Sequence, residues 1–227
     1  LPGGRLRTTL PAEARRIVRL AFAPGGRALA VALPDALHVW EVAGGKRRHA
    51  LGAATDWTFS PDGRHLLLCR VGPAGPACDW YDLASGERLG SYPLGGPNRG
   101  FSQPGLPFVF RPFAFSADGK TLAVAVAEGA LILDAAHGRE RARVKVPPPS
   151  LASRLVLSPG GGLLAALGVG SPEVRLWDTA TGRPLRTISV KGSVLTDLRI
   201  AADERTLVSA GFDALKLWDV RTGQERA

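Results

Sequence analysis

The chain of 227 residues contains no methionine, only two cysteines and two tyrosines, and no long apolar run. Its longest apolar stretches, 122–127 and 163–170, fall far short of the roughly 18 residues that a membrane-spanning helix requires. We therefore expect no membrane segment in this piece. The missing methionine leads us to expect that the piece belongs to a longer protein. Hydrophobic residues make up 45% of the chain, which is enough for a sizeable core and argues against disorder.

Two cysteines are too few for the disulfide framework of a small secreted domain. Cys69 and Cys78 flank a short hairpin. When this hairpin is aligned with the last repeat of the chain, the two positions are not directly opposite and point to different faces. A disulfide would then need a shifted register. We therefore expect free thiols in a reducing compartment and, on this ground, a cytoplasmic location.

Acidic residues are in deficit, with 20 Asp and Glu against 29 Lys and Arg, a formal net charge of +9. Residues 1–50 alone hold nine basic and three acidic side chains. Such an excess can attract nucleic acid, an acidic protein or a lipid headgroup. It can equally protect an exposed sheet edge. We favour the edge explanation, because basic residues recur in the last strand of nearly every repeat and no aromatic residues interleave with them to stack bases. A nucleic-acid partner stays open as the alternative.

Motifs of catalysis are missing from the sequence. It contains no G-x-S-x-G, no P-loop and no G-x-G-x-x-G that opens a helix. Its four histidines, His38, His49, His65 and His137, lack metal-ligand spacing, and its carboxylates are scattered over turns. We therefore expect no catalytic residues, no metal and no cofactor in this chain, although a catalytic domain outside it would be compatible with the sequence.

A repeated phrase dominates what is present. "VRLWDTATGRPLRT" at 174–187 returns as "LKLWDVRTGQERA" at 215–227, and five related units follow one another at a period of about 40–45 residues. The units cover 11–50, 51–94, 108–146, 150–189 and 190–227. Two segments remain: 1–10, expected to form the fourth strand of a preceding or closing sheet, and 95–107, expected to be an inserted loop.

Each unit predicts a meander of four antiparallel strands. "LRI", "FAF" and "LVL" alternate as half-buried strands do, and "SPDG" or "SADG" follows as a turn. "LAVAVA" and "LLAALGV" are nearly continuous apolar runs, which indicates strands buried on both faces. One such sheet cannot bury its faces alone, so neighbouring sheets must stack, and this period is typical of radial stacking.

The phrase "SPDG…VRLWDTATG" resembles the WD40 repeat family in its degenerate bacterial form, over nearly the whole chain. The resemblance implies an all-β fold, a β-propeller built of four-stranded antiparallel blades. Propellers of this family most often have seven blades, so the five units are expected to be a fragment of a larger ring. The third unit departs from the pattern with Leu133 before Asp134, and the first has Trp40 before Glu41.

We expect the Trp-Asp positions to have a structural role. The tryptophans would pack between sheets, and the aspartates would accept hydrogen bonds from backbone amides where a strand turns. The predicted signature residues are Trp40, Trp80, Asp82, Asp134, Trp177, Asp178, Trp218 and Asp219.

Function is expected in loops that a rigid scaffold presents. Three unusual segments, 71–77, 95–107 and 146–150, are predicted to open on one face. Within the second, Arg99, Phe101 and Gln103 are the predicted contacts for a protein or peptide partner, the alternative being a tolerated surface insertion. The sequence thus favours a non-enzymatic protein-protein interaction scaffold. The alternative is a regulatory or sensor domain of a larger multidomain bacterial protein, such as a kinase-linked WD40 protein.

Overall fold

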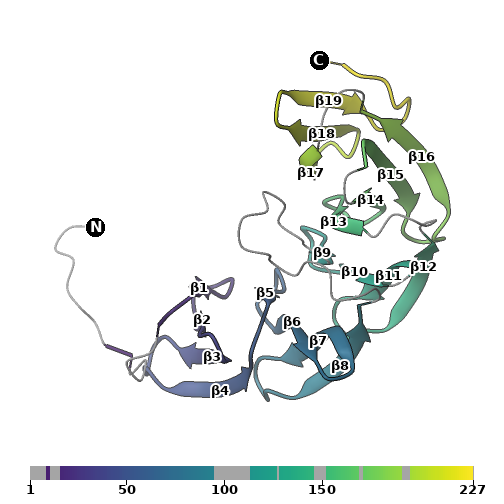
Figure 1. Ribbon diagram of the computed structural model, residues 1–227. Helices are drawn as coiled ribbons and strands as arrows, with labels where there is room; N and C mark the ends of the chain where they lie inside the picture. The colour runs from purple at the N-terminus through teal and green to yellow at the C-terminus, as the bar shows by residue number, and fades with distance from the viewer. Residues whose placement is uncertain are drawn as a thin grey trace.

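The computed structural model describes residues 9–10, 16–94, 113–126, 128–145, 152–168, 171–190 and 195–226. All of its elements are β-strands, which confirms the all-β prediction. They form five antiparallel sheets, called sheets one to five in chain order, that follow one another along an open arc (Figure 1). Within the described residues, no helix is long and apolar enough to cross a membrane.

Sheets one and two are complete meanders. Sheet one contains β1 (Arg19–Phe22), β2 (Ala28–Ala32), β3 (Ala36–Glu41) and β4 (Arg47–Gly52). Sheet two contains β5 (Asp56–Phe59), β6 (His65–Gly72), β7 (Gly75–Asp82) and β8 (Arg88–Pro93). In each of these sheets the first strand lies at the inner side of the arc and the fourth at the outer side (Figure 1).

Sheets three and four repeat this order, and sheet five has three strands. Sheet three contains β9 (Phe113–Phe115), β10 (Thr121–Val126), β11 (Gly129–Asp134) and β12 (Glu140–Lys145). Sheet four contains β13 (Ala152–Leu157), β14 (Leu163–Gly168), β15 (Glu173–Asp178) and β16 (Pro184–Ser189). Sheet five contains β17 (Leu195–Ile200), β18 (Thr206–Gly211) and β19 (Leu215–Asp219), beside which Glu225 makes a single bridge to Trp218.

The turn after each first strand has a local cause. In sheet two the Ser60 hydroxyl donates to Asp62 (2.5 Å) and accepts from the His65 amide (2.9 Å), and Gly63 takes a φ of 69°. Ser116 and Asp118 repeat the first contact at 2.6 Å in sheet three. A short polar side chain followed by a glycine with positive φ therefore closes these turns, as their sequences predict.

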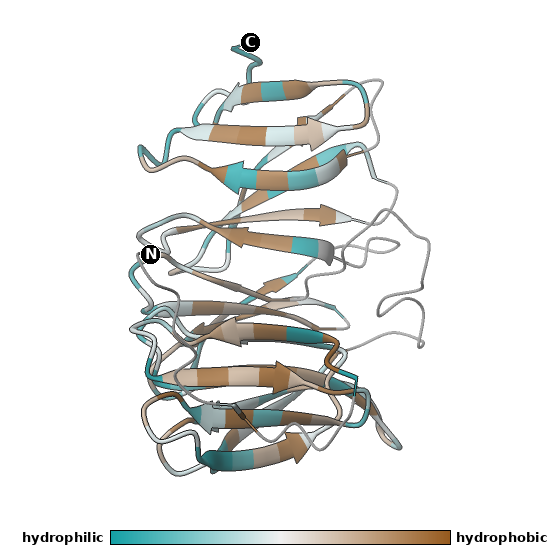
Figure 2. Cartoon of the chain, turned by 90° about the vertical axis from the view of Figure 1, so that its left-hand side faces the viewer, coloured by the Kyte–Doolittle hydropathy of each residue, from teal (hydrophilic) through white to brown (hydrophobic). Residues whose placement is uncertain are grey.

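Apolar side chains hold neighbouring sheets together. The third strand of one sheet packs against the first strand of the next: Leu37 and Val39 of β3 share a buried cluster with Trp57 and Phe59 of β5. The same pairing recurs at the other three boundaries. Apolar residues alternate with polar ones along the half-buried strands (Figure 2). The second strands β10 and β14 are almost wholly buried. The arc is thus stabilised mainly by side chains between sheets.

Trp80, one of the predicted signature residues, points the opposite way from Trp177 and Trp218. Trp177 pairs with Leu164 and Trp218 with Leu207, and both indoles face the preceding sheet. In sheet two the residue in this register is Tyr81, which pairs with Leu66. Trp80 lies one position earlier and packs toward sheet three instead.

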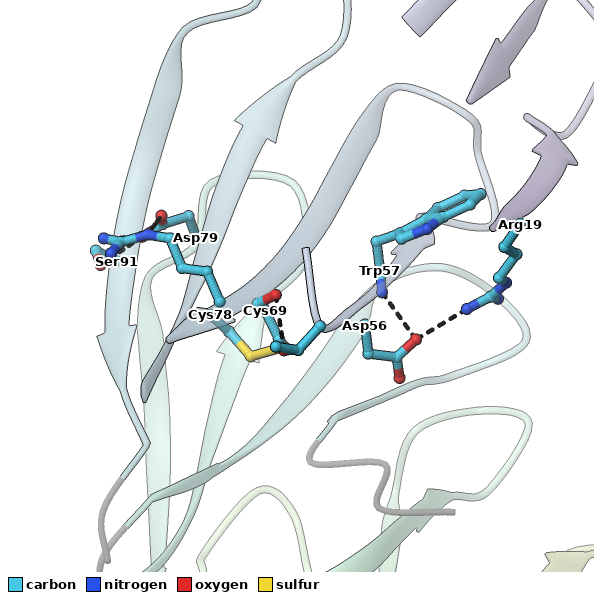
Figure 3. The surroundings of a disulfide bond; sticks show 9 residues. Arg19, Asp56, Trp57, Cys69, Cys78, Asp79 and Ser91 are labelled. Atoms are coloured by element: carbon cyan, nitrogen blue, oxygen red, sulfur yellow. Dashed lines mark hydrogen bonds and ion pairs between the residues drawn. A yellow bond between two sulfur atoms is a disulfide. The ribbon is translucent and has the colours of Figure 1, made fainter. Parts of the chain in front are cut away.

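The prediction of free thiols is wrong, because Cys69 and Cys78 form a disulfide (Figure 3). The alignment behind that prediction placed Trp80 on Trp218, one residue out of register. With Tyr81 in that place, the cysteines are directly opposite on β6 and β7, with their Cα atoms 4.0 Å apart. A cytoplasmic location was expected from free thiols alone, so that expectation loses its basis.

Candidate functional site: the inner groove

The first strands of sheets two to five line an open depression of about 440 Å³ on the inner side of the arc. We call it the inner groove. Its walls come from β5, β9, β13 and β17 and from the turns that follow the first three of these strands. The lining residues are Thr58, Phe59, Pro61, Phe113, Ala114, Phe115, Ala117, Arg154, Leu155, Val156, Leu157, Pro159, Arg199 and Ile200.

One position of the repeat lines the groove in all four sheets. It is the residue just before the last residue of the first strand, and it is occupied by Thr58, Ala114, Val156 and Arg199. The first three are small or medium-sized, which leaves room where the inner strands converge. Arg199 breaks the pattern and places a long cationic side chain, 63% exposed, at the mouth of the groove.

A second position, two residues earlier, carries charge. It holds Arg19 in sheet one, Asp56 in sheet two, Arg154 in sheet four and Asp197 in sheet five. These residues pair across sheet boundaries: Arg19 Nη1 lies 2.9 Å from Asp56 Oδ1, and Arg154 Nη2 lies 2.6 Å from Asp197 Oδ1. The repeat therefore places oppositely charged partners on successive first strands.

The Arg19–Asp56 pair is open to solvent on its cationic side. The Arg19 guanidinium also lies 4.7 Å from the centre of the Trp57 ring, and Asp56 Oδ1 accepts the Trp57 amide at 2.8 Å (Figure 3). The indole thus presents its face to a cation that is already paired. This pair balances its own charge and joins sheets one and two.

The Arg154 cluster is larger than the Arg19–Asp56 pair, because Asp197 receives hydrogen bonds from two arginines. Asp197 Oδ1 accepts from Arg154, from Arg199 Nη1 at 2.8 Å and from the Leu198 amide at 2.5 Å. Two guanidinium groups therefore share one carboxylate. The Arg154 side chain is only 8% exposed, so one of these cations is largely withdrawn from water.

A buried carboxylate, Asp79, lies beside the disulfide, outside the groove. The Asp79 side chain is fully buried, and it accepts from Arg70 and, at 2.6 Å, from the Ser91 hydroxyl (Figure 3). Burial, with Asp79 close by, raises the pKa of the Tyr81 hydroxyl. Neighbouring strands of sheet two supply the hydrogen-bond donors to the Asp79 carboxylate. The arrangement therefore strengthens that sheet and leaves this buried carboxylate no exposed atom for a ligand.

The aspartates that end the third strands close turns. Asp178 Oδ1 accepts from the Thr181 hydroxyl and amide at 2.6 and 2.8 Å, and these hydrogen bonds lower the pKa of Asp178. Asp82 and Asp219 bind the amides of Ser85 and Thr222 in the same way. Their carboxylates are held by their own turns.

Asp134 holds its turn through the amides of Ala136 and His137. Burial of Asp134 acts to raise its pKa, but hydrogen bonds from Arg141 and His137 outweigh burial and lower it to about 2. Asp134 is therefore a carboxylate throughout the physiological pH range.

The histidines lie apart from the groove. His65 is buried and stacks on Trp80 with ring centroids 4.9 Å apart, and burial lowers the pKa of its imidazole. His49 bonds the Leu83 carbonyl at 3.0 Å, which joins sheets one and two. Within the described residues, no group of three His, Cys, Asp or Glu side chains is arranged to hold a metal ion.

The predicted partner contacts Arg99, Phe101 and Gln103 lie outside the described residues, as do segments 95–107 and 146–150. Segment 71–77 is described: it forms the tip of the β6–β7 hairpin, where Gly72 pairs with Gly75. The inner groove is a site that sequence reasoning missed. The sequence does carry a signal for this site, namely a charged residue at one fixed position of the repeat. Only the stacking of the sheets shows which of these charged residues contact one another.

No protein-family model matches the chain, and no curated protein matches it. Its structure is similar to a solved structure described as the crystal structure of the eukaryotic initiation factor, with a TM-score of 0.65 and 18% sequence identity. The match covers 94% of this chain and 55% of the neighbour, so the chain spans about half of that protein's length. At this identity the likeness concerns the fold alone.

Proposed function

We propose that this chain is part of a WD40-like β-propeller that acts as a non-catalytic scaffold and binds a protein or peptide in the inner groove. The observation that carries the proposal is the groove itself. Four first strands, each with one edge that no strand of its own sheet covers, line an open groove large enough for several side chains. Pockets with apolar walls and a few polar groups are the usual form of binding sites.

The lining supports binding more than catalysis. Its polar members are a hydroxyl, Thr58, and two arginines, Arg154 and Arg199, while its remaining members are apolar. Among these lining residues no nucleophile stands beside a general base, as covalent or acid-base catalysis would require. Arginines among aromatic and aliphatic walls are instead typical of recognition surfaces.

Both ends of the arc support membership in a larger ring. Leu215 and Leu217 of sheet five are 73% and 38% exposed, whereas the residues at the same positions of sheets one to four are at most 1% exposed. At the other end, Leu20 is 55% exposed, while its counterparts in the other sheets are at most 6% exposed. Each end sheet thus presents a face that the repeat elsewhere covers with another sheet. We propose that further sheets of the same kind cover them.

A photo-crosslinking experiment tests the binding function. A photoreactive phenylalanine analogue at Val156, in the groove, should crosslink a protein partner from the source organism's extract. The same analogue at Leu185, an exposed residue of the outer strand β16, should not yield that product. Excess unlabelled chain should compete the product away. Equal products from both positions, or none from Val156, would contradict the proposal.

A further inference from the structure

We infer that a second pocket, between sheets one and two, binds a small aliphatic carboxylic acid whose carboxylate is held by Arg27 and Arg64. This open pocket has a volume of about 590 Å³, and we call it the turn pocket. Its walls come from β4 and from the β1–β2, β5–β6 and β7–β8 turns. It shares no lining residue with the inner groove, so the inference does not depend on the proposed binding function.

A sequence difference in one turn makes room for the pocket. In sheet two the turn after the first strand is braced by Ser60 and Asp62, and the matching residues of sheet one are Ala23 and Gly25. A Cβ atom added at Gly25 would meet no other atom within 4 Å. Sheet one therefore leaves open the space beside its turn that the serine and the aspartate take up in sheet two.

Sheet four lacks the same turn aspartate, and there a carboxylate from the next sheet takes its place. Gly160 matches Gly25 in the repeat, and its amide donates to Glu204 Oε1 of sheet five at 2.6 Å. The residue of sheet two that matches Glu204 is Gly63, which has no side chain to offer. Gly25 has a φ of 83°, whereas Gly160 does not have a positive φ. The Gly25 peptide is therefore turned differently, and we assign the donors for a bound carboxylate to side chains.

Three exposed arginines at the rim of the pocket can supply these donors. Arg27 and Arg64 occupy the same position of the repeat, directly before the second strand, and Arg48 comes from β4. Arg48 Nη2 lies 3.4 Å from Glu41 Oε1, whereas Arg27 and Arg64 form no ion pair with any described residue. Two guanidinium groups are thus available for a carboxylate, which arginine binds through charge-assisted hydrogen bonds.

The two aspartates of the pocket favour a ligand of low charge. Asp62 Oδ1 accepts from the Arg64 amide at 3.0 Å, and Asp82 Oδ1 accepts from the Ser85 amide at 2.7 Å. Both carboxylates are therefore held by their own turns, but they keep their negative charge. A phosphate dianion would place two further charges close to them, and a single carboxylate places only one.

Buried apolar residues form the floor of the pocket. Ala23, Ala28 and Leu83 line it and are buried, whereas the arginines are exposed. An aliphatic chain of a few carbons can cover this floor while its carboxylate stays with the guanidinium groups at the rim. Such a combination of apolar surface and a few polar groups is typical of small-molecule sites.

A titration followed by ¹⁵N–¹H correlation spectra of the whole labelled chain tests the inference. Sodium hexanoate should shift the amide signals of Gly25 and Gly63 to saturation. Hexanamide, which has the same shape without the charge, should bind about tenfold more weakly, as the loss of a charge-assisted hydrogen bond predicts. Acetate, which lacks the aliphatic chain, should also bind more weakly than hexanoate.

Four results would overturn the inference. They are the lack of a saturable shift at these glycines, equal binding of hexanamide, equal binding of acetate, and saturation by inorganic phosphate at a lower concentration than hexanoate. The last of these would assign the pocket to phosphate.

Matched variants locate the site. Arg27→Gln and Arg64→Gln should each weaken hexanoate about tenfold. Arg205→Gln removes the same charge at the same position of the repeat in sheet five, outside the pocket, and should leave the affinity unchanged. All three arginines are exposed, so the variants should fold like wild type. If Arg205→Gln weakens hexanoate as much as Arg64→Gln does, net charge alone is responsible and the site is wrong.

Discussion

Arg154 on β13 and Asp197 on β17 form an ion pair that crosses the boundary between sheets four and five, with Nη2 and Oδ1 2.6 Å apart. Arg19 and Asp56 form the corresponding pair between sheets one and two. Both pairs occupy one position of the repeat, but the guanidinium is buried in the first and half exposed in the second. The repeat therefore places the same kind of ion pair in two environments. We expect the two pairs to contribute differently to the free energy of unfolding.

Removal of the two carboxylates should show that difference. Asp197→Asn leaves the buried Arg154 cation with a weaker partner and should lower the free energy of unfolding by about 2–3 kcal/mol, just under the range for fully buried pairs because Asp197 is partly exposed. Asp56→Asn, at the exposed pair, should cost less than about 1 kcal/mol. Urea unfolding followed by tryptophan fluorescence measures both. An equal loss in the free energy of unfolding for Asp197→Asn and Asp56→Asn would contradict the expected difference between the two ion pairs.

The disulfide should stabilise sheet two. Cys69 and Cys78 are separated by nine positions in the chain, and a loop of this length predicts a loss of about 2–3 kcal/mol when the bond is absent. The double variant Cys69→Ala/Cys78→Ala should show this loss in urea, and the reduced wild type should approach it. Thiol titration of the unfolded, unreduced protein should detect no free thiol. Two thiols per chain would contradict the disulfide.

Low pH should destabilise the fold through its turn aspartates. The pKa of Asp134 is about 2 in the folded chain against an ordinary value of 3.8, and the pKa values of Asp178 and Asp219 are also lowered. A carboxyl group with a lowered folded pKa contributes stability above its unfolded pKa and loses it as pH falls through the folded pKa.

We therefore expect the melting temperature to fall as the pH drops from about 4 to about 2, with these groups causing little change from pH 5 to 7. Asp134→Asn should melt at a lower temperature than wild type at pH 5, and the difference should shrink toward pH 2. Scanning calorimetry over this range provides the measurement. If the difference in melting temperature between wild type and Asp134→Asn stays constant across this pH range, Asp134 acts through something other than its charge.

Two leucines at one position of the repeat offer a matched pair. Leu176 is buried against sheet five, and Leu217 is its counterpart on the uncovered face of sheet five. Leu176→Ala should cost about 2–5 kcal/mol, as large-to-small core substitutions do. Leu217→Ala should cost less than about 1 kcal/mol in this chain. Chemical denaturation compares the two, and a large loss for Leu217→Ala would show that its face is already covered in solution.

Much of the fold could be predicted locally. Turns such as Ser60–Gly63 close through contacts between near neighbours, and β10 and β14 are recognisable as buried strands because almost every residue in them is apolar. These features depend on a few consecutive residues, so a single sequence is enough to indicate them. The candidate site could not be predicted in this way, because Arg154 and Asp197 are separated by a whole repeat.

The sequence by itself determined the all-β class, the repeat and the antiparallel meander of each unit, since turn chemistry and the period of apolar residues act over short distances. Only the tertiary structure decided that Cys69 faces Cys78, that Tyr81 takes the place expected for Trp80, and that two arginines share Asp197 at the groove. The physical reason is register: a shift of one residue moves a side chain to the other face of a strand, and packing between sheets selects the shift.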